Sequence, residues 1–176
     1  MPEPLSDTRE IVQVVGACSL PVREHVLSLS SLLGSWGYAV SVIGEVDDDL
    51  SKDLAKSKVP AIVTTLPAGD SFVGSFSAAR RLSRLLRERS PLLVHAHGFR
   101  ASLYAALARR MGLRSPVVCT PNFLPHLLDT ASGRRLRRCA YRYVLERSDA
   151  VIATSEVQSR EVDRIAPGVA IHVVPY

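Results

Sequence analysis

The sequence of 176 residues is long enough for one domain with a hydrophobic core and too short for two domains of ordinary size. Hydrophobic residues make up 47% of the chain and charged residues 22%, a balance that excludes a disordered protein. The net charge of +5 comes from arginines that are concentrated in 80–89 and 134–147. Because no apolar run reaches the length of a signal peptide or of a membrane span, the sequence predicts a cytoplasmic protein without an anchor of its own.

Short apolar runs recur along the chain, and segments with helical periodicity separate them. The runs are rich in β-branched residues and nearly continuous in their apolarity, as expected for strands that are covered on both faces. Strands that alternate with helices imply right-handed crossovers, and therefore a single Rossmann-like, doubly wound, mostly parallel α/β sheet with helices on both faces. The predicted strands are 11–15, 38–44, 61–67, 92–97, 116–121, 150–155 and 171–176.

The segments between these strands predict helices with one apolar stripe each. A capping box, in which Ser155 is followed by Gln158, predicts the start of the last helix, and Pro167 and Gly168 predict its end. The polar stretch 46–58 is either a loop or a short surface helix. The predicted stripes are Val26, Leu29, Leu33 and Trp36 in 22–36, Phe76, Ala79, Leu82 and Leu86 in 76–90, and Leu136, Ala140, Tyr143 and Val144 in 134–148.

Two histidines end the fourth predicted strand. His95 and His97 are two residues apart, so their side chains project from the same face. Doubly wound sheets bind ligands at the carboxyl ends of strands, where the strand order reverses and the first and fourth strands are usually neighbours. We therefore expect the loop 16–21 to face His97 and Gly98. His95 lies deeper in the strand and is expected to be a hydrogen-bonded core residue, with His97 lining the crevice.

The residues around this crevice do not indicate a metal or a nicotinamide cofactor. The loop that begins at Gly16 lacks the further glycines of a dinucleotide-binding fingerprint. No carboxylate or third histidine lies near His95 and His97 in sequence, and the cysteines (Cys18, Cys119 and Cys139) are odd in number and form no CxxC pair. The sequence therefore predicts no metal site, no disulfide framework and a reducing compartment.

Three strand ends carry polar residues and lead towards helices: "HAHGFR", "TPNFLP" and "ATSEVQ". Helix N-termini present free amides and the positive end of a dipole, so an anionic ligand such as a diphosphate is the expected guest. Simpler roles stay open at two of these ends. Ser155 can act only as the cap of its helix, and Asn122 can be a turn residue between Pro121 and Pro125.

Taken together, 92–125, 134–162 and 171–176 resemble the N-terminal domain of family 4 (group 1) glycosyltransferases of the GT-B fold. The shared features are the H-x-H-G segment before a helix rich in alanine and leucine, the Thr-Pro turn after the next strand, and "ERSDAVIATS" before a capped helix. The helix and glycine turn of 23–44 also match the pattern of the family. The motifs occur in the expected order over nearly the whole chain.

The resemblance implies transfer of a sugar from a nucleotide-diphosphate sugar to an acceptor hydroxyl, without a bound metal or other cofactor. In this family the N-terminal domain mostly holds the acceptor, and the donor lies in a cleft shared with a C-terminal domain. The residues implied by position are His97 and Asn122 for catalysis, and Gly16, Ala17, Cys18, Pro21, Gly98, Arg100, Ser155 and Glu156 for acceptor or donor binding.

The sequence departs from the family in three places. Leu20 and Pro21 replace a flexible glycine pair, which stiffens the loop, and Asn122 replaces a frequent histidine and cannot shuttle a proton. The chain stops where the family continues into its second domain, so 1–176 is expected to be the acceptor-side domain without the donor-binding domain. Such a chain is expected to fold, to bind nucleotide sugars weakly and to transfer no sugar by itself.

Two other functions stay open. The chain can be a non-catalytic subunit that docks on a separate donor-binding chain, or a module that binds anionic surfaces. The arginine runs lack the interleaved aromatic residues typical of nucleic-acid binding, so a solvated basic face or a membrane contact is expected instead. Relatives that use lipid-linked acceptors of the cell envelope suggest a peripheral position at the inner face of the membrane. The residues for such a contact are Arg134, Arg135, Arg137 and Arg138.

Overall fold

A computed structural model describes residues 9–16, 19–56, 62–65, 72–121 and 131–175 of the chain. In these residues seven strands form one sheet in the order β3-β2-β1-β4-β5-β6-β7, and every neighbouring pair is parallel. The predicted fold class is confirmed, and β1 and β4 are neighbours as expected. The strands are β1 Glu10–Val15, β2 Ala39–Gly44, β3 Ile62–Thr65, β4 Leu93–His97, β5 Val117–Thr120, β6 Ala150–Ala153 and β7 Ile171–Val173.

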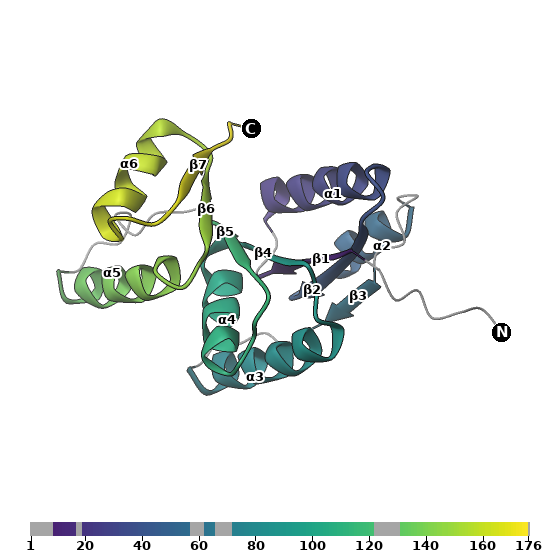
Figure 1. Ribbon diagram of the computed structural model, residues 1–176, viewed down its shortest axis with the longest axis horizontal. Coiled ribbons are helices and arrows are strands. Elements are labelled where there is room, and N and C mark those ends of the chain that lie inside the picture. Colours follow the sequence, from purple (N-terminus) through teal and green to yellow (C-terminus); the bar gives the residue numbers. More distant parts are fainter. Residues whose placement is uncertain (1–8, 17–18, 57–61, 66–71, 122–130, 176) are drawn as a thin grey trace.

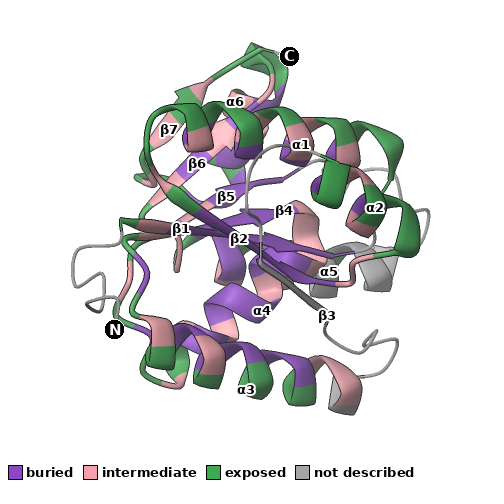
Figure 2. Ribbon diagram, turned by 90° about the vertical axis from the view of Figure 1, so that its right-hand side faces the viewer, coloured by how far each residue is buried: buried purple, intermediate pink, exposed green. Residues whose placement is uncertain are grey.

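Helices cover both faces of the sheet (Figures 1 and 2). Figure 2 shows α1 and α2 over one face and α3 and α4 against the other, while α5 lies beside α4 in Figure 1. This division follows from the right-handed crossovers, because the connections from β1 to β3 run in one direction across the sheet and the later ones run in the other. The helices are α1 Leu20–Ser35, α2 Asp48–Lys56, α3 Phe72–Arg89, α4 Gly98–Arg110, α5 Ala131–Leu145 and α6 Glu156–Ile165.

Among the described residues, three hydrophobic clusters are built from the alternating side chains of the strands. Val12 and Val14 of β1 belong to the larger core with α3 and α4, whereas Val15 packs against residues of α1 and α2. The stretch 46–58 contains the short helix α2 because its leucines, Leu50 and Leu54, are buried in this second core. The helix alternative for this stretch is therefore confirmed.

The predicted apolar stripes are confirmed in the middle of α1 and α3 and at Val144, which is buried near the end of α5, and they are wrong at Trp36 and Phe76. The side chain of Leu136 lies outside the described residues. Trp36 follows the last turn of α1 as its C-cap, and 65% of the side chain is exposed. Phe76, close to the start of α3, is 49% exposed. In α5 the buried aromatic residue is Tyr141, which stacks on Phe99 with ring centroids 4.3 Å apart, and Tyr143 lies partly exposed under Arg147. An end that projects past the sheet has no core to contact, so periodicity alone does not bury it.

The start of α6 agrees with half of the predicted capping box. The Ser155 hydroxyl accepts a hydrogen bond from the Gln158 amide at 3.2 Å. The side-chain oxygen of Gln158 accepts hydrogen bonds from the backbone and the hydroxyl group of Thr154, and not from Ser155. The side-chain nitrogen of Gln158 donates to the Pro121 carbonyl, which follows the end of β5. This glutamine therefore ties the start of α6 to the neighbouring strand end. Among the described residues no helix is long and apolar enough to cross a membrane.

Candidate functional site

The carboxyl ends of β1 and β4 lie side by side at the point where the strand order reverses. Val15 is paired with His97 in the register of the two strands, so Gly16 and Gly98 follow at the same edge of the sheet. A β-carbon at Gly16 would lie 3.1 Å from the Arg100 β-carbon and 3.3 Å from the Ala101 nitrogen. The first turn of α4 therefore packs directly against the chain that leaves β1, and a side chain at Gly16 would make an unusually tight contact with it.

A cluster of imidazole rings lies directly beneath this edge. The rings of His95 and His97 have centroids 4.1 Å apart, which confirms that both project from the same face of β4. His25 of α1 lies over them, with centroid distances of 6.4 Å to His95 and 5.4 Å to His97. The expected difference in burial is wrong, because His97 is 2% exposed and His95 is 5% exposed. Helix α1 covers the end of β4 and buries both rings.

Each histidine of β4 has one polar partner on a neighbouring strand. The Nε2 of His95 lies 2.8 Å from the Thr120 hydroxyl oxygen at the end of β5. The Nε2 of His97 lies 3.1 Å from the side-chain oxygen of Gln13 in the middle of β1. Gln13 is itself fully buried. The two strands that flank β4, β1 and β5, therefore set the orientation of both rings.

Gln13 also determines which nitrogen of His97 carries the proton. Its amide nitrogen donates to the Ser30 hydroxyl oxygen at 2.6 Å and faces the Val26 carbonyl at 3.5 Å. Because a carbonyl only accepts hydrogen bonds, the amide nitrogen must lie on the α1 side and the amide oxygen on the His97 side. His97 then donates from Nε2, and its Nδ1 holds a lone pair. This Nδ1 is buried and has no hydrogen-bond partner in the described part of the chain.

Burial keeps the histidines of this cluster uncharged. It lowers the pKa of His97 well below the usual value, with smaller contributions from repulsion by His95 and His25. Burial lowers the pKa of His95 to about 4, and it also lowers the pKa of His25. A neutral His97 with a free Nδ1 can accept a hydrogen bond or a proton from a hydroxyl group, and it cannot donate from that atom.

An acidic residue at the end of β2 organises the start of α4. The Glu45 carboxylate accepts from Arg100 Nη1 at 2.9 and 3.1 Å and from the Tyr104 hydroxyl at 3.0 Å. Glu45 was missed in the sequence, where it is an ordinary charged residue after a strand. Arg100, predicted to bind a ligand, is placed at the same edge as Gly16, with its guanidinium group engaged by Glu45.

The other predicted site residues are dispersed. Pro21 is exposed in the first turn of α1, and Ser155 and Glu156 are exposed at the start of α6, which follows β6, two strands away from β4. The predictions for Ala17, Cys18 and Asn122 lie outside the described residues. No group of three or more His, Cys, Asp or Glu residues in the described ranges is arranged to hold a metal ion. His97 and Gly98 are brought together with Gly16 and Arg100, and the α6 residues are not.

Sequence reasoning also missed Gln13 and His25. The signal for Gln13 was present, because it is the one polar residue in the apolar run 11–15. A polar side chain in a strand that is covered on both faces must find a partner, and this requirement could have pointed to the neighbouring strand. His25 gave no comparable signal, because a histidine on an amphipathic helix is equally compatible with an exposed position.

Replacing Gln13 with leucine is expected to lower the free energy of unfolding by about 1–3 kcal/mol, because buried polar groups of His97 and Ser30 lose their partner. It should also allow either ring nitrogen of His97 to carry the proton, because Gln13 no longer holds the proton on Nε2. Imidazole nitrogen chemical shifts of labelled protein report the tautomer, and urea denaturation reports stability. Ser30→Ala is the matched control, because it removes the other partner of Gln13 and should leave the His97 tautomer unchanged. An unchanged tautomer in Gln13→Leu would contradict the assignment.

The sheet order is that of a Rossmann-like domain, as in one half of a GT-B protein. Residues 22–176 match the family described as the glycosyl transferase 4-like domain. The chain belongs to this family, which confirms the resemblance to the N-terminal domain of family 4 glycosyltransferases. No curated protein sequence matches the chain.

Solved structures share the fold at low sequence identity. A glycosyltransferase from Rickettsia africae superimposes with a TM-score of 0.73 at 16% identity over 96% of this chain and 43% of its own. HepE from Anabaena, in complex with UDP and glucose, gives 0.71 at 16% identity over 95% and 44%. A UDP-GlcNAc 2-epimerase from Methanocaldococcus jannaschii gives 0.63 at 15% identity over 94% and 45%. The chain spans less than half the length of each of these proteins.

Proposed function

We propose that the chain is the acceptor-side domain of a glycosyltransferase that moves a sugar from a nucleotide-diphosphate sugar to an acceptor hydroxyl. The observation that carries this proposal is the buried, neutral His97, whose Nδ1 has no partner in the described residues and lies at the switch point of the sheet. The shared fold does not choose the reaction, since an epimerase also has it. Membership in the glycosyl transferase 4-like family favours glycosyl transfer.

In this proposal each feature of the edge has a separate task. The lone pair on Nδ1 of His97 is the acceptor left for a sugar hydroxyl beside Gly98, and because α1 buries this ring, the hydroxyl reaches it only when the sugar displaces the packing of α1 over the end of β4. Gly98 has a positive φ of 80° and begins α4, whose first amides point towards the carboxyl edge and favour an anionic diphosphate. A UDP and glucose complex of the similar HepE structure supports a nucleotide sugar as the ligand.

Both walls of a transfer site are needed to align an acceptor with a departing diphosphate. The described edge of the sheet supplies helix amides and one neutral imidazole, and these form only one side of such a site. We therefore propose that this domain acts together with a donor-binding domain, joined to it or supplied by a separate chain. Alone, the 176 residues are expected to bind UDP- and GDP-sugars with a Kd of about 1 mM or weaker, which corresponds to about 4 kcal/mol.

The proposed role of His97 predicts a local response to nucleotide sugars. Titration of histidine-labelled chain with UDP-glucose and GDP-mannose should shift the imidazole signals of His97 and leave those of His172, which is exposed in β7, unchanged. In calorimetric titrations with the same sugar nucleotides, His97→Gln should abolish the binding heat, and His172→Gln should retain it. If neither sugar nucleotide moves the His97 signals at millimolar concentration, the proposed site is wrong.

The donor-binding domain is either joined to this chain or supplied by a separate chain, and a transfer assay distinguishes the two cases. If the domain is joined to this chain, the longer protein transfers sugar by itself, and His97→Gln lowers kcat/KM by more than its loss of stability in urea denaturation explains. If the chain is a subunit, activity requires addition of a second protein that carries the donor site. A complete protein that epimerises a UDP-sugar without transferring it would replace the proposal with the chemistry of the epimerase-like neighbour.

A contact between an anionic membrane and the arginines at the start of α5 stays a prediction. Arg135 and Arg138 are exposed, and Arg138 also donates to the Arg164 carbonyl at 3.2 Å. The side chains of Arg134 and Arg137 lie outside the described residues. Of the four predicted arginines, the described side chains therefore offer two exposed ones, and one of these is engaged within the domain.

A further inference from the structure

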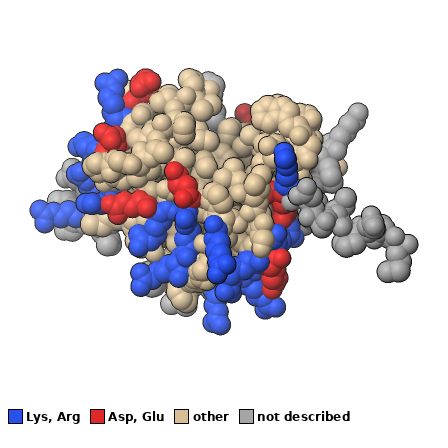
Figure 3. Space-filling view, in the orientation of Figure 1, with Lys and Arg blue, Asp and Glu red and all other residues tan. Residues whose placement is uncertain are grey.

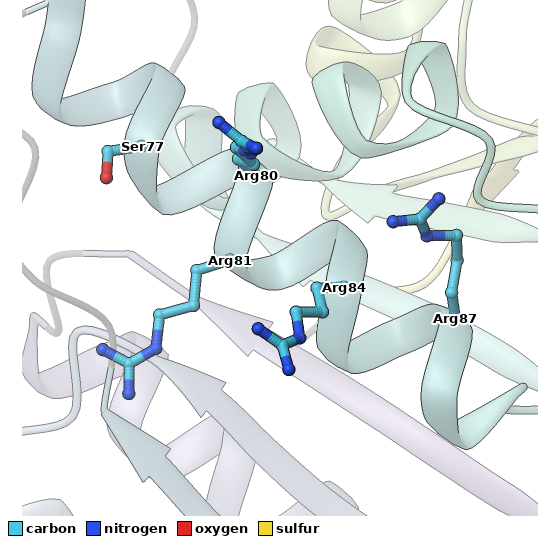
Figure 4. A pocket seen from close by; sticks show the side chains of 5 residues that line it. All are labelled: Ser77, Arg80, Arg81, Arg84 and Arg87. Carbon is cyan, nitrogen blue, oxygen red and sulfur yellow. The ribbon is translucent and has the colours of Figure 1, made fainter.

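The strongest concentration of positive charge on the described residues lies on α3. Figure 3 shows lysine and arginine side chains gathered at the lower part of the molecule, where α3 lies in Figure 1. Four arginines of this helix and one serine line a shallow groove of about 450 Å³: Ser77, Arg80, Arg81, Arg84 and Arg87 (Figure 4). All of these side chains are exposed. We refer to these five residues as the α3 surface.

The charge of the α3 surface is largely uncompensated. Among the described residues, Arg84 has a carboxylate partner in Glu88 at 2.9 Å, and no carboxylate lies within salt-bridge distance of Arg80, Arg81 or Arg87. Arg84 and Glu88 are both well exposed, at 78% and 58%, so this pair adds little to stability and is easily exchanged for another anion. The surface therefore offers guanidinium groups to an external partner at no cost to the fold.

The directions of the arginines distinguish between a small anion and an extended one. Arg81 and Arg84 leave one side of the helix, whereas Arg80 and Arg87 leave the other, and the four groups do not converge on one point (Figure 4). A single phosphate is held by donors that converge on its oxygens. Diverging guanidinium groups spread over two helical turns instead match a surface on which negative charges are distributed.

An exposed aromatic ring adjoins these cations. Phe76 is 49% exposed and borders a second depression of about 250 Å³ together with Arg80, Ser83, Arg87 and Met111. The apolar face of α3 is buried in the core, so its contact with a bilayer would rest on the attraction between basic side chains and anionic headgroups, with Phe76 as the apolar side chain that enters the interface. Nucleic acid would instead require several aromatic rings between the cations for stacking, and Phe76 is the sole aromatic residue among the described side chains of α3.

We propose that the α3 surface binds an anionic phospholipid bilayer, with the arginines on lipid phosphates and Phe76 in the headgroup region. The proposal does not depend on the reaction that the domain catalyses, and it uses a surface separate from the histidine cluster. It also replaces the arginines at the start of α5 as the principal membrane contact. The expected consequence is that the domain is held at the membrane through α3.

Vesicle sedimentation of the 176-residue chain tests this proposal. The chain should sediment with vesicles of equimolar phosphatidylcholine and phosphatidylglycerol, should stay in solution with phosphatidylcholine alone, and should be released by salt. Replacing Arg80, Arg81, Arg84 and Arg87 with glutamine should weaken binding at least about tenfold, because each cation near an anionic bilayer contributes to the affinity.

A matched control carries the same change in net charge at other exposed positions: Lys52, Lys56, Arg114 and Arg160 to glutamine. This variant should keep most of the vesicle affinity. Phe76→Ser should weaken binding severalfold and leave the salt dependence unchanged. Equal losses in the two charge variants would overturn the proposal in favour of unspecific attraction, and tighter binding to duplex DNA than to the vesicles would overturn it in favour of nucleic acid.

Discussion

Replacing Gly44 with alanine is expected to destabilise the domain by about 4 kcal/mol or more, at the upper end of what single substitutions do. Gly44 ends β2 with a φ of 150° and is paired with Val15 of β1. A β-carbon added at Gly44 would lie 1.8 Å from the Val15 carbonyl oxygen, and backbone of a central strand cannot move away cheaply. Urea denaturation of the variant measures the loss.

Gly37→Ala is the matched control for this prediction. Gly37 also has a positive φ, 83°, but a β-carbon there would meet nothing within 4 Å. The cost should therefore be only that of a left-handed backbone, about 1–2 kcal/mol. If the two variants lose the same free energy, the close approach of β1 and β2 at Gly44 does not matter to folding.

The histidine cluster is expected to make the domain sensitive to mild acid. Burial lowers the pKa of His95 from 6.5 to about 4 in the folded state, so the unfolded chain binds the proton more readily. Stability is therefore complete above pH 6.5 and falls as the pH drops towards 4. At about 1.4 kcal/mol per pH unit, His95 alone removes about 2 kcal/mol between pH 7 and pH 5.

His97 acts in the same direction, because burial also lowers its pKa. His25 faces both rings from α1, and the polar groups that pack against them from the neighbouring strands, Gln13 and Thr120, carry no charge. Among the described contacts of His95 and His97, no carboxylate is therefore present to compensate an imidazolium ion.

Urea denaturation between pH 7 and pH 5 measures this dependence. His95→Gln should flatten the profile, since it removes a titrating group, while His172→Gln on the exposed face of β7 should reproduce the profile of the unchanged protein. A profile that His95→Gln leaves as steep as before would show that other groups cause the loss of stability in acid.

The strands and the class of sheet that they form were determined by the sequence. Continuous β-branched runs such as 11–15 mark strands that are covered on both faces, and helices between them allow only right-handed crossovers. The usual strand order of such doubly wound sheets then places β1 beside β4, and the two-residue period of a strand places His95 and His97 on one face. None of these conclusions required knowledge of contacts between distant residues.

The chemistry of the site was decided by tertiary packing. Whether His97 is open or buried depends on how far α1 extends over the end of β4, and its tautomer depends on Gln13, which is 84 residues away in the chain. The engagement of Arg100 likewise depends on Glu45 from another strand end, and the exposure of Trp36 and Phe76 on where the sheet stops beneath their helices. Periodicity identifies the face of an element on which a side chain lies, but the partner of a buried polar atom is set by whichever element packs there.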